Sequence, residues 1–433
     1  MHLAQRTYIL LVLTAVLAIA GLWSSAPELA GLWRWPLGLL LLGVALESWW
    51  MRSMPVRAEL SSAPRGFLGR PQPVAFVFHN SAPRPLAIEY VPVMPPGFEG
   101  PSGTRQLIAP SHAIASDALV LTPVRLGTHA WPALPARVLG RLGLIWWSHE
   151  QALARNIVVA PDVLHTARAR ARGISSGSRP RRAAGAGSEL HQLRGYVPGD
   201  PLARIDWKAT ARLGNLVSRE FSEDQHLDIL IAIDAGRASR VRAGPLDRLG
   251  LYANIAARFA ETATPNDDRV GLLVFSDRPL ALVPPTRGLE AIVRVRRALE
   301  ELAPERTESD PLAAAVRIRA LLKHRSLVVL LADLADATLA EALARAVRLL
   351  SPPHLVVLAG VHSPQIAALA ARPARGWRDP WIALAAREHE ERAARQRTLL
   401  RKLGAPVIAA SEELLERAVL EEYELLRRSR RIG

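Results

Sequence analysis

The chain has 433 residues, a formal net charge of +15 and no cysteine. This length allows two or three domains, and the lack of cysteine excludes disulfides, thiolate metal sites and a cysteine nucleophile. The positive charge is carried by arginine far more than by lysine, and it favours an anionic neighbour such as a membrane surface, an acidic protein or nucleic acid. A solvated arginine-rich surface is an equally good explanation.

Two apolar stretches near the N-terminus predict membrane-spanning helices. Residues 8–23 and 35–50 hold no charge before Glu47, and each is close to the shortest length that spans a bilayer. Tryptophans gather at their ends, and arginines flank the pair, which favours a transmembrane hairpin over 1–54 with both ends in the cytoplasm. A signal peptide cleaved near 18–20 is the alternative. In either case we expect the body of the protein on the cytoplasmic side.

Residues 55–162 have the pattern of a small antiparallel β-sandwich. Prolines are frequent, and short alternating runs are separated by turn residues. The clearest of these runs are 74–78, 86–91, 118–121 and 157–159. An apolar run at 139–147 is expected to pack in the core. The region holds no pattern that indicates catalysis.

Residues 163–190 are predicted to form a basic, flexible linker, because glycine, serine and arginine dominate without apolar periodicity. Residues 173–177 match the G-x-S-x-G nucleophile pattern, but this pattern has meaning only between a strand and a helix. The arginines could contact anionic lipid or nucleic acid. Specific nucleic-acid binding is not predicted, because no aromatic residues are interleaved with them.

From 191 to 433 the chain alternates apolar runs with helical patterns, which predicts a doubly wound α/β domain. The expected strands are 227–233, 270–275, 280–283, 327–332, 355–359 and 406–408. The expected helices are 245–262, 289–302, 311–322, 338–350, 382–403 and 412–427.

The sequence holds no motif that indicates an enzyme. Neither phosphate-binding glycine loop is present, and no histidine pair has the spacing of a helical zinc site. A Ser-His-Asp arrangement cannot be assembled from the sequence, and no small-molecule substrate is evident. A hydrolase that uses Asp234 and Asp333 therefore remains the least favoured interpretation.

Two predicted strands end in aspartates, Asp234 and Asp333. Carboxyl ends of parallel strands meet at one edge of a sheet, and two carboxylates with a hydroxyl can hold Mg²⁺. With Thr307, these residues follow the order of the metal-ion-dependent adhesion site of the von Willebrand factor A domain, which this region resembles. That site uses D-x-S-x-S, but Gly236 and Ala238 replace the serines here. The resemblance implies a degenerate site with Mg²⁺ as the one candidate cofactor; alternatively, the aspartates cap helices or pair with arginines.

A long motif precedes the first of these strands. It reads LRGYVPGD at 193–200, RIDWKATAR at 204–212 and REF at 219–221. This motif resembles the signature of domain of unknown function family 58, bacterial membrane-anchored relatives of the A domain, and the resemblance extends over nearly the whole chain. It implies a non-enzymatic partner of a MoxR-type AAA+ ATPase, working in the assembly or maturation of protein complexes at the inner membrane.

The motif also has a direct physical interpretation. Asp200 is expected to cap a helix over 201–213, with Trp207 anchoring that helix to the sheet. The residues expected along one helix face are Arg204, Lys208 and Arg212. Such a face suits an acidic protein surface, although pairing of these arginines with Asp200, Asp206 or Glu220 is the alternative. The residues predicted to bind a partner are Tyr196, Pro198, Gly199, Asp200, Arg204, Asp206, Trp207, Lys208, Arg212, Arg219 and Glu220.

Overall fold

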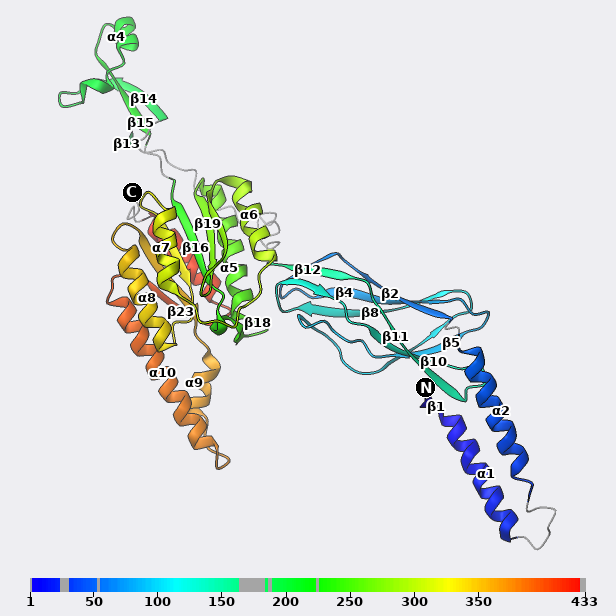
Figure 1. Ribbon diagram of the computed structural model, residues 1–433. Helices are drawn as coiled ribbons and strands as arrows, with labels where there is room; N and C mark the ends of the chain where they lie inside the picture. Colours follow the sequence, from blue (N-terminus) through cyan, green and yellow to red (C-terminus); the bar gives the residue numbers. More distant parts are fainter. Residues whose placement is uncertain are drawn as a thin grey trace. The chain divides into compact units, whose positions relative to one another are not determined.

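A computed structural model describes residues 2–23, 31–52, 55–162, 184–185, 189–222 and 226–428 (Figure 1). The chain is a mixed α/β protein with several sheets, and it divides into two compact units, Met1–Ala160 and Pro161–Gly433. Most of the predicted linker over 163–190, including the G-x-S-x-G match, lies outside the described residues.

The first unit begins with two helices, α1 (Gln5–Trp23) and α2 (Arg34–Trp50), which run side by side (Figure 1). Among the described residues, α1 is the one helix whose length and composition would allow it to cross a membrane. The apolar side chains of both helices are largely exposed, as Leu22 at 78% and Leu39 at 76% illustrate. The sequence prediction of a span is therefore supported for α1.

The rest of the first unit is made of β-strands. They are β1 (His2–Leu3), β2 (Val56–Ser62), β3 (Arg65–Phe67), β4 (Gln72–Asn80), β5 (Leu86–Tyr90), β6 (Phe98–Glu99), β7 (Arg105–Ala109), β8 (Ile114–Pro123), β9 (Gly127–Ala130), β10 (Leu134–Leu139), β11 (Ile145–Gln151) and β12 (Asn156–Ala160). They form sheets in the orders β1-β11-β10-β5-β7, β2-β4-β8-β6 and β3-β12-β9. Alternate residues of β4 are buried. The ring centres of Phe76 in β4 and Tyr90 in β5 are 5.4 Å apart, and this contact joins the two larger sheets.

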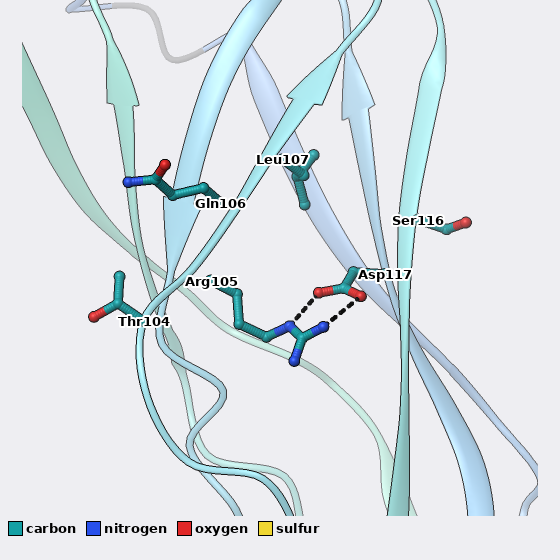
Figure 2. A pocket seen from close by; sticks show the side chains of 6 residues that line it. All are labelled: Thr104, Arg105, Gln106, Leu107, Ser116 and Asp117. Carbon is teal, nitrogen blue, oxygen red and sulfur yellow. Dashed lines mark hydrogen bonds and ion pairs between the residues drawn. The ribbon is translucent and has the colours of Figure 1, made fainter.

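A polar link ties the two larger sheets together beside this aromatic core. Arg105 of β7 binds Asp117 of β8 through two hydrogen bonds (Figure 2). The Tyr90 hydroxyl donates to the same carboxylate at 2.6 Å. Arg105 and Asp117 line a shallow, open depression with Thr104, Gln106, Leu107 and Ser116. Partial burial acts to raise the pKa of Asp117, but the hydrogen bonds from Arg105 and Tyr90 together outweigh it and lower that pKa. We interpret this link as structural.

Glu47 of α2 fastens the helices to the sheets. Its side chain is fully buried, and its carboxylate accepts backbone N–H groups of Leu142 at 2.5 Å, Gly143 at 3.0 Å and Leu144 at 2.9 Å. These residues form the turn between β10 and β11. The sequence marks Glu47 as the first charge of an apolar stretch, but it does not reveal this contact.

The second unit is built on a six-stranded sheet with the order β20-β19-β16-β21-β22-β23. Its strands are β16 (Asp228–Asp234), β19 (Arg269–Phe275), β20 (Pro279–Thr286), β21 (Leu327–Leu331), β22 (Leu355–Val361) and β23 (Val407–Ala410). β20 is antiparallel to β19, and the other neighbouring pairs are parallel. The apolar runs predicted as buried strands therefore lie at the centre of a largely parallel sheet.

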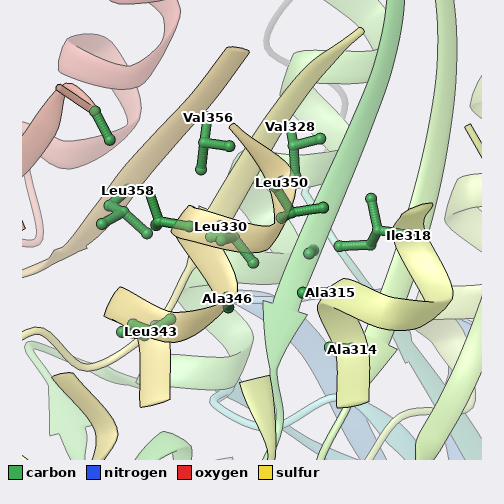
Figure 3. Close-up of a cluster of buried hydrophobic side chains, with 14 of the residues drawn as sticks. Ala314, Ala315, Ile318, Val328, Leu330, Leu343, Ala346, Leu350, Val356 and Leu358 are labelled. Carbon is green, nitrogen blue, oxygen red and sulfur yellow. The ribbon is translucent and has the colours of Figure 1, made fainter. Parts of the chain in front are cut away.

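Helices cover both faces of this sheet (Figure 1). One face carries α5 (Arg248–Ala263), α6 (Gly288–Glu300) and α11 (Leu415–Arg428). The other carries α7 (Pro311–Leu321), α8 (Ala337–Leu350) and α10 (Asp379–Arg401). Figure 3 shows the core under the second group, where Leu330 of β21 lies in one buried cluster with Ile318 and Leu343. Leu230 of β16 belongs to the same cluster. The predicted helices are present, and the structure adds α9 (Pro364–Ala371), which the sequence analysis missed.

A separate three-stranded sheet contains the motif at 193–221. It is made of β13 (Ala184–Gly185), β14 (Glu189–Gly195) and β15 (Val217–Ser222), and two further short strands, β17 (Arg242–Ala243) and β18 (Leu246–Asp247), pair elsewhere. We call residues 189–222 the arm. Between β14 and β15 the arm holds a 3-10 turn at Leu202–Arg204 and the helix α4 (Trp207–Leu213).

The prediction of one helix over 201–213, capped by Asp200, is wrong. Helix α4 begins at Trp207, and Asp206 caps it by accepting the N–H groups of Lys208 and Ala209. Ile205 is buried and bridges to Ser218 of β15, so the backbone stays extended before α4. Trp207 is 65% exposed, so the prediction that it anchors the helix to the sheet is wrong. The predicted end at Leu213 is confirmed, with Gly214 in a left-handed conformation at φ 73°.

Candidate functional site

The two strand-end aspartates meet at one edge of the six-stranded sheet. Asp234 is the last residue of β16, and Asp333 follows the end of β21, the parallel neighbour of β16. Asp234 is buried at 1% exposure, and the Asp333 side chain is 13% exposed. The structure therefore places these two predicted site residues together, as the sequence pattern indicates.

Asp234 is held by donors from two loops. Its Oδ1 accepts the backbone N–H of Gly236 at 2.8 Å and the hydroxyl of Ser309. Its Oδ2 is buried and accepts no hydrogen bond from the described residues. Burial raises the pKa of Asp234, and the charge of Asp333 adds to that rise, while the two hydrogen bonds and Arg248 oppose it. This carboxyl is therefore more easily protonated than an ordinary aspartate.

Ser309 occupies the space that the missing serine side chain at 236 would fill. A Cβ atom at Gly236 would lie 2.1 Å from the Ser309 hydroxyl oxygen and 3.0 Å from the Thr307 carbonyl oxygen. Because residue 236 has no side chain, the 307–309 loop can approach Asp234. Ser309 of this loop then donates its hydroxyl to the Asp234 carboxylate. The sequence analysis singled out Thr307 and missed Ser309, although the two are only two residues apart.

Thr307 contributes to the same edge but is directed to different partners. Its hydroxyl lies 2.6 Å from the hydroxyl of Ser276 and donates to Asp277 at 3.3 Å. Its carbonyl accepts the N–H of Arg237 at 2.9 Å. Thr307 therefore joins its loop to the turns after β16 and β19.

Arg248 supplies the positive charge at this edge. Its guanidinium forms an ion pair with Asp333, and its side chain is 11% exposed. The Asp333 carboxylate also accepts the N–H of Ala335 at 3.0 Å. This arrangement matches the alternative interpretation of Asp333. Its carboxylate pairs with an arginine and accepts a nearby backbone N–H group.

In this arrangement the predicted site residues offer a divalent ion few free ligands. No group of three or more His, Asp or Glu side chains in the described part of the chain could hold one. Mg²⁺ needs several oxygen ligands in octahedral geometry, but both motif serines are absent, Asp333 is paired with Arg248, and Thr307 binds Ser276 and Asp277. The guanidinium of Arg248 thus neutralises Asp333, one of the two carboxylates that a metal would require.

The predicted partner-binding residues of the arm divide into two groups. The first group shapes the arm: Arg194 binds Asp200 through two hydrogen bonds of 2.8 Å, and Arg219 lies 3.7 Å from Asp206. In this group Gly199 has a φ of 108°, which favours glycine, within the turn formed by Tyr196 and Pro198. The side chain of Glu220 lies outside the described residues.

The second group faces solvent. Trp207, Lys208 and Arg212 of α4 are exposed, and Arg204 is half-buried in the preceding turn. Because Lys208 and Arg212 are four residues apart, they lie on one side of α4. Of the acidic partners that the alternative named, Asp200 binds Arg194 and Asp206 lies near Arg219, while pairing with Glu220 lies outside the described residues. The exposed group is therefore available for contact with a partner.

The fold and this edge define a mixed α/β protein in which a sheet edge rich in carboxylates and hydroxyls is neutralised by an internal arginine. Residues 192–380 match the family model described as "Protein of unknown function DUF58", which includes most of the arm and the sheet edge. The wider resemblance, over the N-terminal unit, stays a prediction.

Curated relatives match in a smaller region. An uncharacterized protein of Mycobacterium bovis is 24% identical over 151 residues, which is 34% of this chain and 48% of that protein. An uncharacterized protein of Mycobacterium tuberculosis matches with the same identity and coverage. The chain spans about half the length of the curated relatives it matches.

Two of the solved structures that align with this chain are distant from it. Proximal thread matrix protein 1 from the mussel byssus aligns with a TM-score of 0.30 and 14% identity, covering 47% of this chain and 46% of that one. The cupredoxin domain of amoB from Nitrosocaldus yellowstonii aligns with a TM-score of 0.18 and 13% identity, covering 25% of this chain and 88% of that one. Likeness at this level carries no argument about this chain.

Proposed function

We propose that this protein is a membrane-anchored protein-interaction module whose arm binds an acidic surface of a partner protein. The resemblance of the motif at 193–221 makes a MoxR-type AAA+ ATPase the expected partner, in the assembly or maturation of protein complexes near the membrane. The anchor is a two-helix hairpin of α1 and α2 in the inner membrane, with both units on the cytoplasmic side. No catalytic role is part of this proposal.

Three features support the anchor. Helix α1 is long and apolar enough to span a bilayer, and α2 carries exposed apolar side chains along its length. Trp23 and Trp35 lie at the ends of the helices and are 90% and 80% exposed, as suits tryptophan at headgroup level. Because Glu47 is fully buried against the β10–β11 turn, it does not place a bare charge among lipid chains.

We also propose that the second unit has a von Willebrand factor A-like fold. Its support is a central parallel sheet with helices on both faces and with Asp234, Thr307 and Asp333 in the order of the adhesion-site motif. In this unit Arg248 of α5 places a positive charge at the sheet edge, where the adhesion site would hold a metal ion. The fold then serves as a scaffold that presents the arm.

The observation that carries the interaction proposal is the exposed side of α4. Trp207 is 65% exposed, and Leu202 and Leu213 on either side of it are 70% and 67% exposed. Lys208 and Arg212 lie on the same short helix. Tryptophan and arginine dominate the energetics of protein interfaces, and a basic group selects an acidic partner by charge. An apolar centre with basic neighbours thus fits an acidic protein surface.

The test uses the full chain in nanodiscs and a purified MoxR-type AAA+ ATPase from the same organism. Trp207→Ala should weaken the Kd about 30-fold, because a central interface tryptophan contributes about 2 kcal/mol. Reversing the charges with Lys208→Glu and Arg212→Glu should abolish binding, and the binding of the native chain should weaken as salt is raised.

Leu289→Ala is the matched control, since Leu289 of α6 is 77% exposed and lies outside the arm. It should leave the Kd unchanged. Equal affinity of the native chain and both arm variants would refute the role of the arm. Failure of the native chain to bind would refute the ATPase as partner.

A metal-dependent ligand-binding module is the alternative function, and one observation favours it. Asp234 Oδ2 is buried and accepts no hydrogen bond from the described residues, which leaves one oxygen for a ligand. Calorimetric titration of Mg²⁺ and Mn²⁺ distinguishes the two proposals. Saturable binding that Asp234→Ala removes, with loss of partner binding on chelation, would support the metal-dependent function over the one proposed above.

A further inference from the structure

The segment that joins α9 to α10 and the first turn of α10 carry one exposed tryptophan each. Trp377 is 77% exposed and Trp381 is 68% exposed, whereas tryptophan is highly buried on average. Ile382 and Leu384, on the first turns of α10, are exposed as well. We call residues 372–384 the tryptophan tip. It forms the end of the α9–α10 hairpin that points away from the six-stranded sheet (Figure 1).

The tryptophan tip is also basic. Arg372, Arg375 and Arg378 are exposed, and Asp379 is the one acidic residue in this stretch of the sequence. The Asp379 carboxylate accepts the backbone N–H of Arg375 at 2.7 Å and that of Gly376 at 2.8 Å. Its charge is therefore engaged with the backbone, and the outer surface of the tip keeps an excess of arginine.

These same contacts shape the tip before any partner arrives. The two hydrogen bonds to Asp379 close the turn that leads into α10, and the guanidinium of Arg378 lies 4.9 Å from the centre of the Trp377 ring. A preformed shape reduces the conformational entropy that would be lost on binding. The tryptophans are thus presented by an ordered turn.

We infer that the tryptophan tip binds the anionic surface of a lipid bilayer. Tryptophan rings settle at the level of lipid headgroups, and arginines near a membrane are attracted to anionic lipids. The tip presents both residue types on a protruding helical end, which suits a fluid headgroup layer. Because α1 is able to cross a membrane, the chain would meet such a surface. The tip would then hold the α/β unit against the bilayer through a contact separate from the anchor.

The absence of cysteine allows a direct test. The variant Ala374→Cys, in the full chain, is labelled with an environment-sensitive fluorophore and reconstituted in nanodiscs of phosphatidylcholine alone or with about 30% phosphatidylglycerol. Lipids that carry a shallow quencher should quench this label in the anionic discs. Arg375→Gln should lower the ratio of docked to undocked tip about fivefold, and the joint change Trp377→Ser and Trp381→Ser should abolish quenching.

Ala394→Cys is the matched control, because Ala394 is exposed on the same helix, about 15 Å or more from the tip at 1.5 Å per residue. Its label should not respond to the lipid quencher. The inference would be overturned if the label at 374 met only aqueous quencher in both disc types, or if only an added protein shielded it. This inference rests on the proposed anchor, and incorporation into discs reports the anchor while the label reports the tip, so the two failures are distinguishable.

Discussion

Arg248 and Asp333 form an ion pair at the sheet edge, with side chains 11% and 13% exposed. Arg248 is the first residue of α5, and Asp333 follows β21, so the pair joins a helix to the end of a strand far along the chain. Removal of one partner from a largely buried pair leaves the other charge without compensation. Asp234 lies at the same edge, where the charge of Arg248 opposes the rise of the Asp234 pKa.

Arg248→Met is expected to destabilise the α/β unit by about 3–5 kcal/mol, because it leaves Asp333 as an uncompensated buried charge. Hydrogen–deuterium exchange of the β16 and β21 peptides measures this loss locally, which avoids treating a two-unit chain as a two-state folder. Exchange should be much faster in the variant. Arg248→Lys keeps the charge and serves as the control, with a smaller effect. Equal exchange in the native chain and in Arg248→Met would contradict this role.

Divalent ions should distinguish the native chain from a variant without the arginine. In Arg248→Ala, Mg²⁺ can occupy the space beside the two carboxylates, so millimolar Mg²⁺ should slow exchange at β16 and β21. We expect no such protection in the native chain, where the guanidinium neutralises Asp333. Protection of the native chain that Asp234→Ala abolishes would show that the internal arginine does not replace a metal.

The stability contribution of Asp234 should depend on pH. Burial raises the pKa of Asp234 above its ordinary 3.8, so the folded state binds this proton more tightly than the unfolded state does. The contribution is therefore fully present below pH 3.8 and is lost as the pH rises through the raised pKa of the folded state. Asp234→Asn removes this dependence.

Stability curves of the native chain and Asp234→Asn, measured from about pH 4 to about pH 7, test this expectation. The stability of the variant relative to the native chain should increase as the pH rises. The amide side chain of the variant would still offer an oxygen to Gly236 and Ser309, so the hydrogen bonds to Oδ1 are matched. A relative stability that falls with pH would mean that the carboxylate is better compensated than its burial indicates.

Gly236 is required for space and not for backbone conformation. Its φ is −73°, which any residue adopts, but an added Cβ would lie 2.1 Å from the Ser309 hydroxyl oxygen. Gly236→Ser, which restores the motif residue, should therefore destabilise the unit by about 1–3 kcal/mol. Adding Ser309→Gly should recover much of that loss. Thermal unfolding measures both variants, with Gly195→Ala as the control, since a Cβ there meets nothing within 4 Å.

Glu47 should determine whether α2 stays attached to the sheets. Glu47→Ala leaves three backbone N–H groups without their acceptor, and each buried donor left unpaired costs about 1–3 kcal/mol. Gly140→Ala should act in the same direction, because its Cβ would lie 2.2 Å from the Glu47 carboxylate. Limited proteolysis of the β10–β11 turn in nanodiscs measures the loss. Gly38→Ala, in the same helix with open space around it, should have no effect.

Local patterns in the sequence predict most elements of this protein. Continuous apolar runs identify β16, β21 and β22, because a strand buried on both faces must be apolar throughout. Helical spacing identifies α5, α8 and α11 in the same way. Asp234 and Asp333 could be paired as neighbours, because carboxyl ends of parallel strands share an edge. These features depend on periodicity, which a sequence displays directly.

The arm shows where local patterns are insufficient. Asp200 and Pro201 form a good helix start by themselves, yet the chain makes only a 3-10 turn at Leu202–Arg204. The burial of Ile205 and its bridge to Ser218 then keep the chain extended until α4 begins. Pairing with a strand outweighed the local capping signal. Trp207 faces solvent for the same reason, since the short helix that remains contacts little else.

Residue patterns alone were enough to locate the strands of the six-stranded sheet, most of the helices, and the two carboxylates and a threonine at one sheet edge. They did not show which charges and hydroxyls meet at that edge, because those contacts form only when the chain is folded. Arg248 reaches Asp333, and Ser309 fills the space left by Gly236. The backbone N–H groups that Glu47 binds are likewise distant in sequence. Such contacts join residues far apart in the chain, and their geometry depends on packing, which periodicity and spacing do not encode.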